Sequence, residues 1–372
     1  MGERLRLSFD AVANGEGRNG GLNIQDPAFE TPSEWKYALG ATYTFENDLL
    51  VMLDFLYSDK KNSAIISDFS RGLSGDSAPD GRPIYTSVNG RRQDFVLTNV
   101  NGDSGDATTI SIGLSQTLDN GIDWSASYAN ISTDEVSPMT SSVAFSNYLN
   151  NTSDPENPGL AASNYEIPQR FTFSLAYTNE FFDGYRTRFN MFATVNEGRP
   201  YSYTFGEDTG FAFGDSVGFV DRHLLYVPDL NDSNVVYTSV TEDNGDITPF
   251  DIEAFNAFID SEGLTRGDIM GRNSINGDWW TKVDLRVSQE FPGFMKEHKG
   301  EAFIVIENVG NMLNDDWGVL YETSFPRAQP AIQASINDAG QYEYKAFLDP
   351  AGQTRVGDAS LWSVRIGVNY KF

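Results

Sequence analysis

Histidine and cysteine, which carry much of the acid–base, nucleophilic and metal chemistry of proteins, are scarce in this sequence. The chain has 372 residues, no cysteine and two histidines, His223 and His298. His223 lies in a long acidic segment, where Asp221 or Asp229 could pair with its imidazole. No Ser-His-Asp, H-E-x-x-H or P-loop pattern accompanies either histidine. We therefore expect His223 to be a solvated loop residue, and we expect no catalytic residue, no cofactor and no enzyme activity.

Acidic residues gather in two segments that could attract a divalent cation. The candidate ligands are Asp103 and Asp106 in "NGDSGD" and Asp243, Asn244, Asp246 and Asp251 in "TEDNGDITPFD". Neither segment has the ligand spacing of an EF-hand calcium loop. Asn-Gly-Asp also favours tight turns. The pattern indicates turns more strongly than calcium binding, so we expect no metal site.

Charge and hydropathy narrow the classes of partner. Lys and Arg number 26 against 53 Asp and Glu, which gives a formal net charge of −27. Nucleic-acid phosphates require a basic surface, so we expect no nucleic-acid partner. No apolar run reaches the roughly 18 residues that predict a membrane-spanning helix. The opening "MGERLRLSFD" has no signal-peptide pattern.

Alternation of apolar and polar residues is the dominant pattern of the chain. In "LWSVRIGVNYKF" (361–372) the apolar members are Trp362, Val364, Ile366, Val368, Tyr370 and Phe372. This period of two predicts a strand with one apolar face. The pattern recurs in segments 3–12, 35–45, 49–58, 107–118, 122–131, 170–180, 185–196, 280–290 and 300–310. Segment 300–310 is apolar on both sides at its middle, which leaves its orientation open.

The length of these segments matches a bilayer better than an ordinary sheet. A tilted strand crosses the hydrocarbon with about 9–11 residues, whereas the usual strand has roughly 5–6. The faces opposite the apolar ones carry charges that a dry interior would not accept unpaired. We expect these charged residues to face a watery lumen: Arg186, Arg188, Lys282, Asp284, Arg286, Arg365 and Lys371.

The connections between the predicted strands alternate in length. Short ones lie at 46–48, 119–121, 181–184 and 291–299, and long ones at 13–34, 59–106, 132–169, 197–278 and 311–359. Every short connection therefore falls on the same side of the predicted sheet. Outer-membrane barrels have this asymmetry, with short periplasmic turns and long external loops.

The longest connection, 197–278, holds 16 acidic residues, 4 Arg and one predicted helix. That helix covers 248–264, with Thr248 as a possible N-cap and Gly263 as its stop. Aromatic residues also gather in this connection: Tyr201, Tyr203, Phe205, Phe211 and Phe213. They could stack on a ligand, or they could pack the loops together.

Several segments resemble the C-terminal barrel of TonB-dependent receptors. These are "WWTKVDLRVSQEFPGF" (279–294), "AFIVIENVGNMLNDDWG" (302–318) and the terminal strand. "YVPDLND" (226–232), the helix at 248–264 and "GDIMGRNSING" (267–277) are similar to the Oar-like branch of that family. The resemblance implies an all-β fold: a portion of a transmembrane antiparallel barrel with about ten long strands, short periplasmic turns, long extracellular loops and one short loop helix.

The resemblance also implies partners and missing parts. A receptor of this family has a plug domain, a TonB box, a signal peptide and a barrel of about 22 strands, and residues 1–372 show only part of such a barrel. We therefore expect a C-terminal portion of an outer-membrane receptor of a Gram-negative bacterium, for an unidentified ligand, with lipid around it. TonB and the plug would act only in the full-length receptor. Val364, Ile366, Val368, Tyr370 and Phe372 would be the signal read by the barrel-assembly machinery.

Two other interpretations remain open on the sequence. A complete small passive outer-membrane barrel or adhesin explains the alternation and the loops equally well. A soluble β-sandwich or carbohydrate-binding module explains the aromatic content and the acidity, but it predicts shorter strands with a mostly apolar inner face.

Overall fold

The computed structural model describes residues 21–88, 90, 93–207, 209–241, 246–295, 297–350 and 352–372. Strands make up 52% of the structure and helices 8%, so the prediction of an all-β chain is confirmed. The predicted strand at 3–12 lies outside the described residues.

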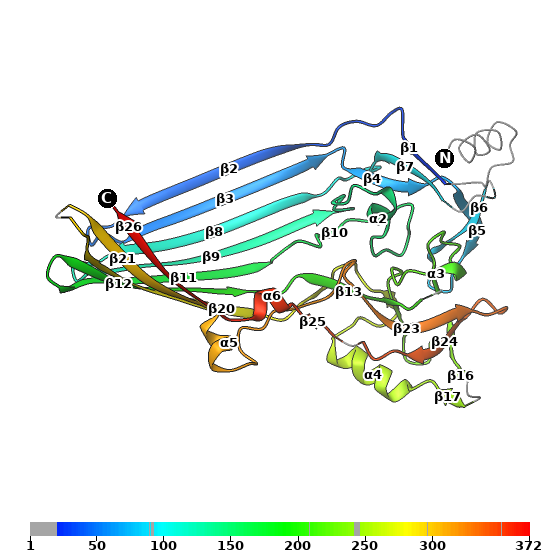
Figure 1. Ribbon diagram of the computed structural model, residues 1–372. Helices are drawn as coiled ribbons and strands as arrows, with labels where there is room; N and C mark the ends of the chain where they lie inside the picture. The colour runs from blue at the N-terminus through cyan, green and yellow to red at the C-terminus, as the bar shows by residue number, and fades with distance from the viewer. Residues whose placement is uncertain are drawn as a thin grey trace, which may run out of the picture.

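One large antiparallel sheet forms the body of the molecule (Figure 1). Its long strands, in spatial order, are β2 (Ser33–Thr44), β3 (Leu50–Lys61), β8 (Asp106–Thr117), β9 (Ile122–Glu135), β11 (Gln169–Phe182), β12 (Tyr185–Asn196), β20 (Trp280–Pro292), β21 (Lys299–Glu307) and β26 (Ser363–Lys371). The short β10 (Ala161–Ala162) pairs with the end of β9. We call this the main sheet. Each of its long strands corresponds to a segment whose alternation predicted it.

Consecutive long strands are neighbours, so the main sheet is a meander in which hairpins alternate with long excursions. The hairpin turns at 45–49, 118–121, 183–184 and 293–298 all lie at one end. Residues with positive φ make the tight reversals: Asp48 at 60°, Gly121 at 83° and Gly184 at 79°. The predicted alternation of short and long connections is therefore confirmed.

The described strands of the main sheet do not close into a barrel. Within the described ranges, no long strand pairs with the outer edge of β2 or of β26. Every long-strand pair is antiparallel and the path holds nine long strands of the described chain, so β2 and β26 run in the same direction. An antiparallel closure between these two edges would require an odd number of further strands.

The long connections fold together at the opposite end from the hairpin turns (Figure 1), and we call this part the loop domain. Its strands are β1 (Leu22–Gln25), β4 (Ala64–Asp68), β5 (Arg71–Ser77), β6 (Pro83–Ser87), β7 (Asp94–Asn99), β13 (Pro200–Phe205), β14 (Tyr226–Val227), β15 (Val235–Tyr237), β16 (Ser239–Thr241), β17 (Ile247–Pro249), β18 (Asp268–Ile269), β19 (Ile275–Asn276), β22 (Tyr321–Glu322), β23 (Ala328–Ile336), β24 (Tyr342–Phe347) and β25 (Thr354–Arg355). They form small sheets, of which β15-β24-β23-β13-β19 and β1-β7-β4 are the largest.

The short helices lie in the long connections. They are α2 (Ala144–Tyr148), α3 (Thr209–Ala212), α4 (Ile252–Ser261), α5 (Val309–Leu313) and α6 (Gly357–Ser360). Helix α4 is shorter than the predicted 248–264, because Asp251 and not Thr248 caps it: the Asp251 carboxylate accepts from the Ala254 N–H at 2.9 Å. Gly263, with φ of 64°, ends it as predicted. Of the helices in the described ranges, none is long and apolar enough to cross a membrane.

The buried core of the molecule lies in the loop domain and not beneath the main sheet. Its largest cluster draws buried side chains from three long connections, including Phe205, Leu225, Phe255, Ile332 and Tyr344. A smaller cluster joins Ile66, Phe95, Tyr148 and Val217. The loops are therefore a packed unit with their own apolar interior.

Candidate functional site

One whole face of the main sheet is apolar and exposed. Leu39, Ile366 and Val368 keep 73%, 77% and 65% of their surface accessible. Other large apolar side chains on this face are also exposed: Tyr37, Tyr43, Leu53, Phe55, Ile110, Ile112, Phe171, Phe173, Phe189 and Val364. We call this the apolar face.

Strand register makes the apolar face continuous. One row of directly opposed residues runs Tyr43, Val51, Leu114, Ala126, Phe173, Ala193 and Val283 across neighbouring strands. A second runs Trp124, Leu175, Met191, Leu285, Ile306 and Val364. A slip of one residue in any pair would turn a strand's apolar set to the other side. The register also orients segment 300–310: Ile304 and Ile306 join the apolar face, whereas Phe303 and Val305 lie on the other.

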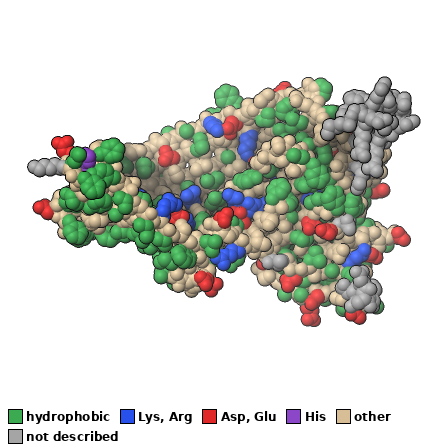
Figure 2. All heavy atoms as spheres, in the orientation of Figure 1, with side chains coloured by type: hydrophobic (Ala, Val, Ile, Leu, Met, Phe, Trp, Pro, Cys, Tyr) green, Lys and Arg blue, Asp and Glu red, His purple; other side chains and the backbone are tan. Residues whose placement is uncertain are grey.

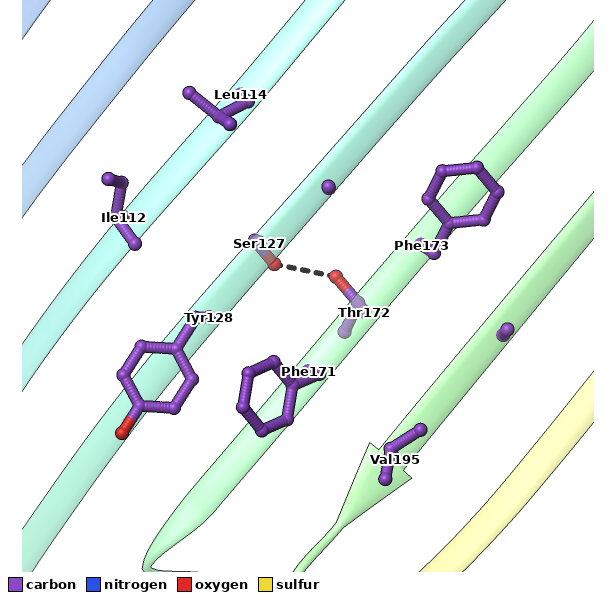
Figure 3. A pocket seen from close by; sticks show the side chains of 10 residues that line it. Ile112, Leu114, Ser127, Tyr128, Phe171, Thr172, Phe173 and Val195 are labelled. Atoms are coloured by element: carbon purple, nitrogen blue, oxygen red, sulfur yellow. Dashed lines mark hydrogen bonds between the residues drawn. The ribbon is translucent and has the colours of Figure 1, made fainter.

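A shallow groove of ≈340 Å³ lies in this face where two small residues, Ala126 and Ala193, stand among larger ones. Figure 3 shows the apolar side chains that border it, from Ile112 and Leu114 to Phe171, Phe173 and Val195. Ser127 and Thr172, whose hydroxyl oxygens lie 2.6 Å apart, alternate with these residues along β9 and β11. The groove belongs to the apolar face and has no charged lining among the described residues.

The opposite face of the main sheet carries paired charges, and we call it the polar face. Arg186 Nη2 lies 3.0 Å from Glu290 Oε1, Arg286 Nη2 lies 3.2 Å from Glu301 Oε1, and Arg365 Nη2 lies 3.2 Å from Glu307 Oε1. These are cross-strand pairs, and their side chains keep contact with water. Figure 2 shows Lys and Arg next to Asp and Glu in the hollow at the middle of the view.

The structure places all the charged residues predicted to face a lumen on the polar face. Beyond the three pairs, Arg188 Nε donates to Thr178 Oγ1 at 3.1 Å, and Lys282 Nζ lies 3.5 Å from Asp284 Oδ1. The guanidinium of Arg286 also stacks over the Phe303 ring at 4.6 Å. Their shared face is thus established, and the lumen itself stays a prediction.

The terminal strand is fastened to the last hairpin by its aromatic end. The Tyr370 hydroxyl accepts the Phe294 N–H at 2.8 Å and lies 3.0 Å from His298 Nδ1. Val364, Ile366 and Val368 continue the apolar face, and Phe372 keeps 95% of its surface accessible. These positions leave the predicted assembly signal on an edge strand that pairs only with β21 among the described strands, and its recognition stays a prediction.

The run Asn308–Val309–Gly310–Asn311 anchors the loop-domain end of β21. Asn308 is fully buried and adopts a left-handed conformation with φ of 54°. Its side-chain amide donates to the carbonyl oxygens of Gly318 at 2.9 Å and Ser360 at 2.8 Å, while its own N–H donates to Asp284 Oδ1 at 2.8 Å. One asparagine therefore ties β20, β21 and both ends of the 308–362 connection together.

The aromatic residues of segment 197–278 serve mainly as loop-domain core. Tyr201, Tyr203, Phe205 and Phe213 are 7% exposed or less, and Phe211 is 47% exposed. The Phe205 and Tyr342 rings have centroids 5.5 Å apart and are tilted by 39°, within the distance range of interacting aromatic pairs. The prediction that these residues pack the loops together is confirmed for those four.

His223 is buried, and its partner is Asp215 rather than Asp221 or Asp229, so the expectation of a solvated loop histidine was wrong. His223 Nε2 lies 2.8 Å from Asp215 Oδ2, and Arg222 Nε donates to the same oxygen at 2.7 Å. The Arg222 guanidinium also stacks 4.2 Å from the centre of the Tyr148 ring. The carboxylate accepts, so the proton of the neutral imidazole is on Nε2.

In this cluster the pKa values of both Asp215 and His223 are lowered. Burial alone would raise the pKa of Asp215, but Arg222 and His223 outweigh it and hold that pKa well below its ordinary range. Burial lowers the pKa of His223 and outweighs the opposing effect of Asp215, and the charges of Arg222 and Arg82 lower it further. A second buried pair, Arg82 and Asp80 at 2.7 Å, packs against Phe213. Sequence reasoning missed both pairs, since tertiary folding alone brings these charges inside.

The acidic segments do not form a metal centre in the part of the chain that the structure describes. No group of three or more His, Asp and Glu residues there could hold an ion. Asp251 caps α4, and Asp103 accepts the Gly105 N–H at 3.0 Å as a turn residue. Asp243 and Asn244 lie outside the described residues.

No protein-family model matches the sequence, and a search of curated proteins finds no match.

Proposed function

We propose that this chain forms barrel wall and extracellular loops of an outer-membrane receptor or transporter of the TonB-dependent class. The observation that carries the proposal is the apolar face, which is continuous across the long strands and exposed. Monomeric soluble proteins rarely expose apolar patches beyond about 300–600 Å². Contact with lipid hydrocarbon removes the cost of exposing this apolar surface to water, and it requires no shape complementarity.

Strand dimensions support the same environment. The long strands have 9 to 14 residues, and about 9–11 residues in a tilted strand cross the hydrocarbon. With lipid against the apolar face, the polar face and its ion pairs line the inside of the wall. The compact turns then lie on the periplasmic side, and the acidic loop domain lies outside the cell.

The assignment to TonB-dependent receptors rests on the residues that resemble that family. The Asn308 run directly follows β21 and begins α5, and the alternating terminal segment forms β26. Bilayers do not accept unpaired strand edges at hydrocarbon depth. The edges of β2 and β26 therefore require further strands, as in a chain that is one portion of a larger barrel.

Fractionation tests the membrane assignment. The chain, given a signal peptide and produced in a Gram-negative host, is expected in the outer membrane when strands that complete the barrel are supplied. Recovery of a folded protein from the periplasm without detergent would contradict the proposal and favour a soluble β-sandwich.

Electrophoretic mobility separates the receptor portion from a complete small barrel or adhesin. Closed barrels migrate faster when unheated than after boiling in SDS. We expect the chain alone to give no such compact monomer, because no long strand of the described ranges pairs with the outer edge of β2 or of β26. A heat-modifiable monomer of the chain alone would favour the small barrel.

A further inference from the structure

A cleft of ≈760 Å³ opens in the loop domain beside helix α4. Four parts of the chain border it: the start of β13, one side of α4, Asp278 just before β20, and the segment from the end of β24 onward. These parts come from two long connections, one between β12 and β20 and one between β21 and β26, so the cleft is a product of the folded loop domain. Its size suits a small organic molecule.

Aromatic rings form the floor of this cleft. The rings of Tyr203 and Phe258 meet edge to face, with centroids 4.8 Å apart, and Phe258 lies 5.4 Å from Phe347. The ring centroids of Tyr201 and Tyr203 are 5.5 Å apart, also in edge-to-face geometry. Each ring is held by another ring, so the floor is preformed.

Carboxylates form the rim, and one of them organises the floor. The Tyr203 hydroxyl donates to Glu262 Oε2 at 3.0 Å, so the Tyr201 hydroxyl, 3.2 Å away, donates to the Tyr203 oxygen. Asp278 and Asp349 stand exposed on the rim. Among the described residues that line the cleft, none is Lys or Arg.

We propose that this cleft binds an organic cation with an apolar or aromatic body, such as an alkylammonium compound. Aromatic faces attract ammonium groups, and they do so more strongly where water is partly displaced. The acidic rim adds long-range attraction and repels anions. A bare metal ion would gain little from the aromatic floor. A neutral sugar could stack on the rings and donate hydroxyl hydrogen bonds to the carboxylates, but it would gain no long-range attraction from their charge.

The biological role of this cleft rests on the proposed function, which places the loop domain outside the cell. Binding itself does not depend on the membrane, so the two proposals fail separately. Binding without membrane insertion would leave the cleft assignment standing and remove the receptor. Insertion without binding would remove only the cation site.

The test is a titration of the full chain, folded in detergent micelles, with choline. The matched probe is 3,3-dimethylbutan-1-ol, which has the same shape and no charge. Saturation-transfer NMR reports weak binding of both. We expect choline to bind at least about fivefold more tightly than the alcohol and to weaken as salt is raised. Equal affinity for both, tighter binding of glucose, or no binding of choline would overturn the proposal.

Variants locate the binding. Glu262→Gln keeps an acceptor for Tyr203 and removes the charge, so choline affinity should fall about threefold to tenfold. Glu253→Gln is the control, because Glu253 is exposed on the same helix and does not line the cleft. Phe258→Leu should also weaken binding, with the near-ultraviolet dichroism reporting that the domain stays folded. An equal loss in the Glu253 variant would show a nonspecific charge effect and contradict the assignment.

Discussion

The side-chain amide of Asn308 donates to the carbonyl oxygen of Gly318 at 2.9 Å, and Gly318 has no room for a side chain facing that amide. A Cβ built on Gly318 would lie 2.0 Å from Asn308 Oδ1, and the glycine has φ of +63°. The loop that follows α5 is thus folded onto the asparagine that ends β21.

Gly318→Ala is expected to destabilise the chain more than an alanine at an open turn. Left-handed backbone costs a non-glycine residue about 1–2 kcal/mol, and the clash with Asn308 adds to this. Gly340→Ala is the control, since φ is +74° there with nothing within 4 Å of the added atom. Urea unfolding in detergent measures both. If the two variants lost equal free energy of unfolding, the close approach of Gly318 to Asn308 would contribute nothing to stability.

Asp215→Asn is expected to cost about 3–5 kcal/mol of unfolding free energy, because it leaves the buried Arg222 charge without its partner. Arg222 and Asp215 are 1% and 0% exposed. Glu307→Gln removes the partner of Arg365, which is 69% exposed, and should cost about 1 kcal/mol or less. The comparison uses chemical denaturation followed by tyrosine and tryptophan fluorescence. A small loss at Asp215 would contradict the buried pair.

The burial of His223 predicts a pH dependence of stability. Its folded pKa is lowered from the ordinary 6.5, so below that pH the unfolded chain binds a proton that the folded chain does not. Stability should fall as the pH drops from 6.5, by up to about 1.4 kcal/mol per unit from this group. His223→Gln keeps a donor for Asp215 and should remove that component of the slope. At pH 8 the imidazole is neutral in both the folded and the unfolded state. The difference in unfolding free energy between the unsubstituted protein and the His223→Gln variant at that pH therefore reports packing alone. Identical slopes from pH 5 to pH 6.5 would contradict this account.

Adjacent positions in the middle of β11 should respond oppositely to charge. Leu175 lies on the apolar face, opposite Trp124 and Met191, and Ser174 lies on the polar face. Leu175→Arg is expected to cost about 2–4 kcal/mol in a bilayer, as arginine does at the midplane of a barrel. Ser174→Arg should be tolerated. Folding yields into lipid vesicles measure both, and equal yields would contradict a lipid-facing side.

Local patterns predicted the main sheet because each strand carries its own period of two and each hairpin its own turn residues. Asp48, Gly121 and Gly184 have the positive φ that such reversals need. Within the loop domain, local patterns predicted helix α4 and its end at Gly263, but not the packing of the long connections on one another. Asp215 and Arg222 are close in sequence, but their burial depends on packing against another connection, where Arg222 stacks on Tyr148. The choice of Asp251 over Thr248 as the cap of α4 is local, and the sequence pattern did not distinguish the two. The aromatic residues of segment 197–278 could stack on a ligand or pack the loops together, and only the folded structure distinguishes these two roles.

The lipid-facing role of the apolar face can be measured directly, because the chain has no cysteine. The experiment places one cysteine at a time at positions 172 to 177 of β11, attaches a nitroxide spin label and incorporates each variant in lipid bilayers. The label reports its contact with oxygen, which partitions into lipid, and with a water-soluble nickel chelate. We expect oxygen contact to peak at 173, 175 and 177 and nickel contact at 172, 174 and 176. Uniform nickel contact at all six positions, or the two peaks exchanged, would contradict the account.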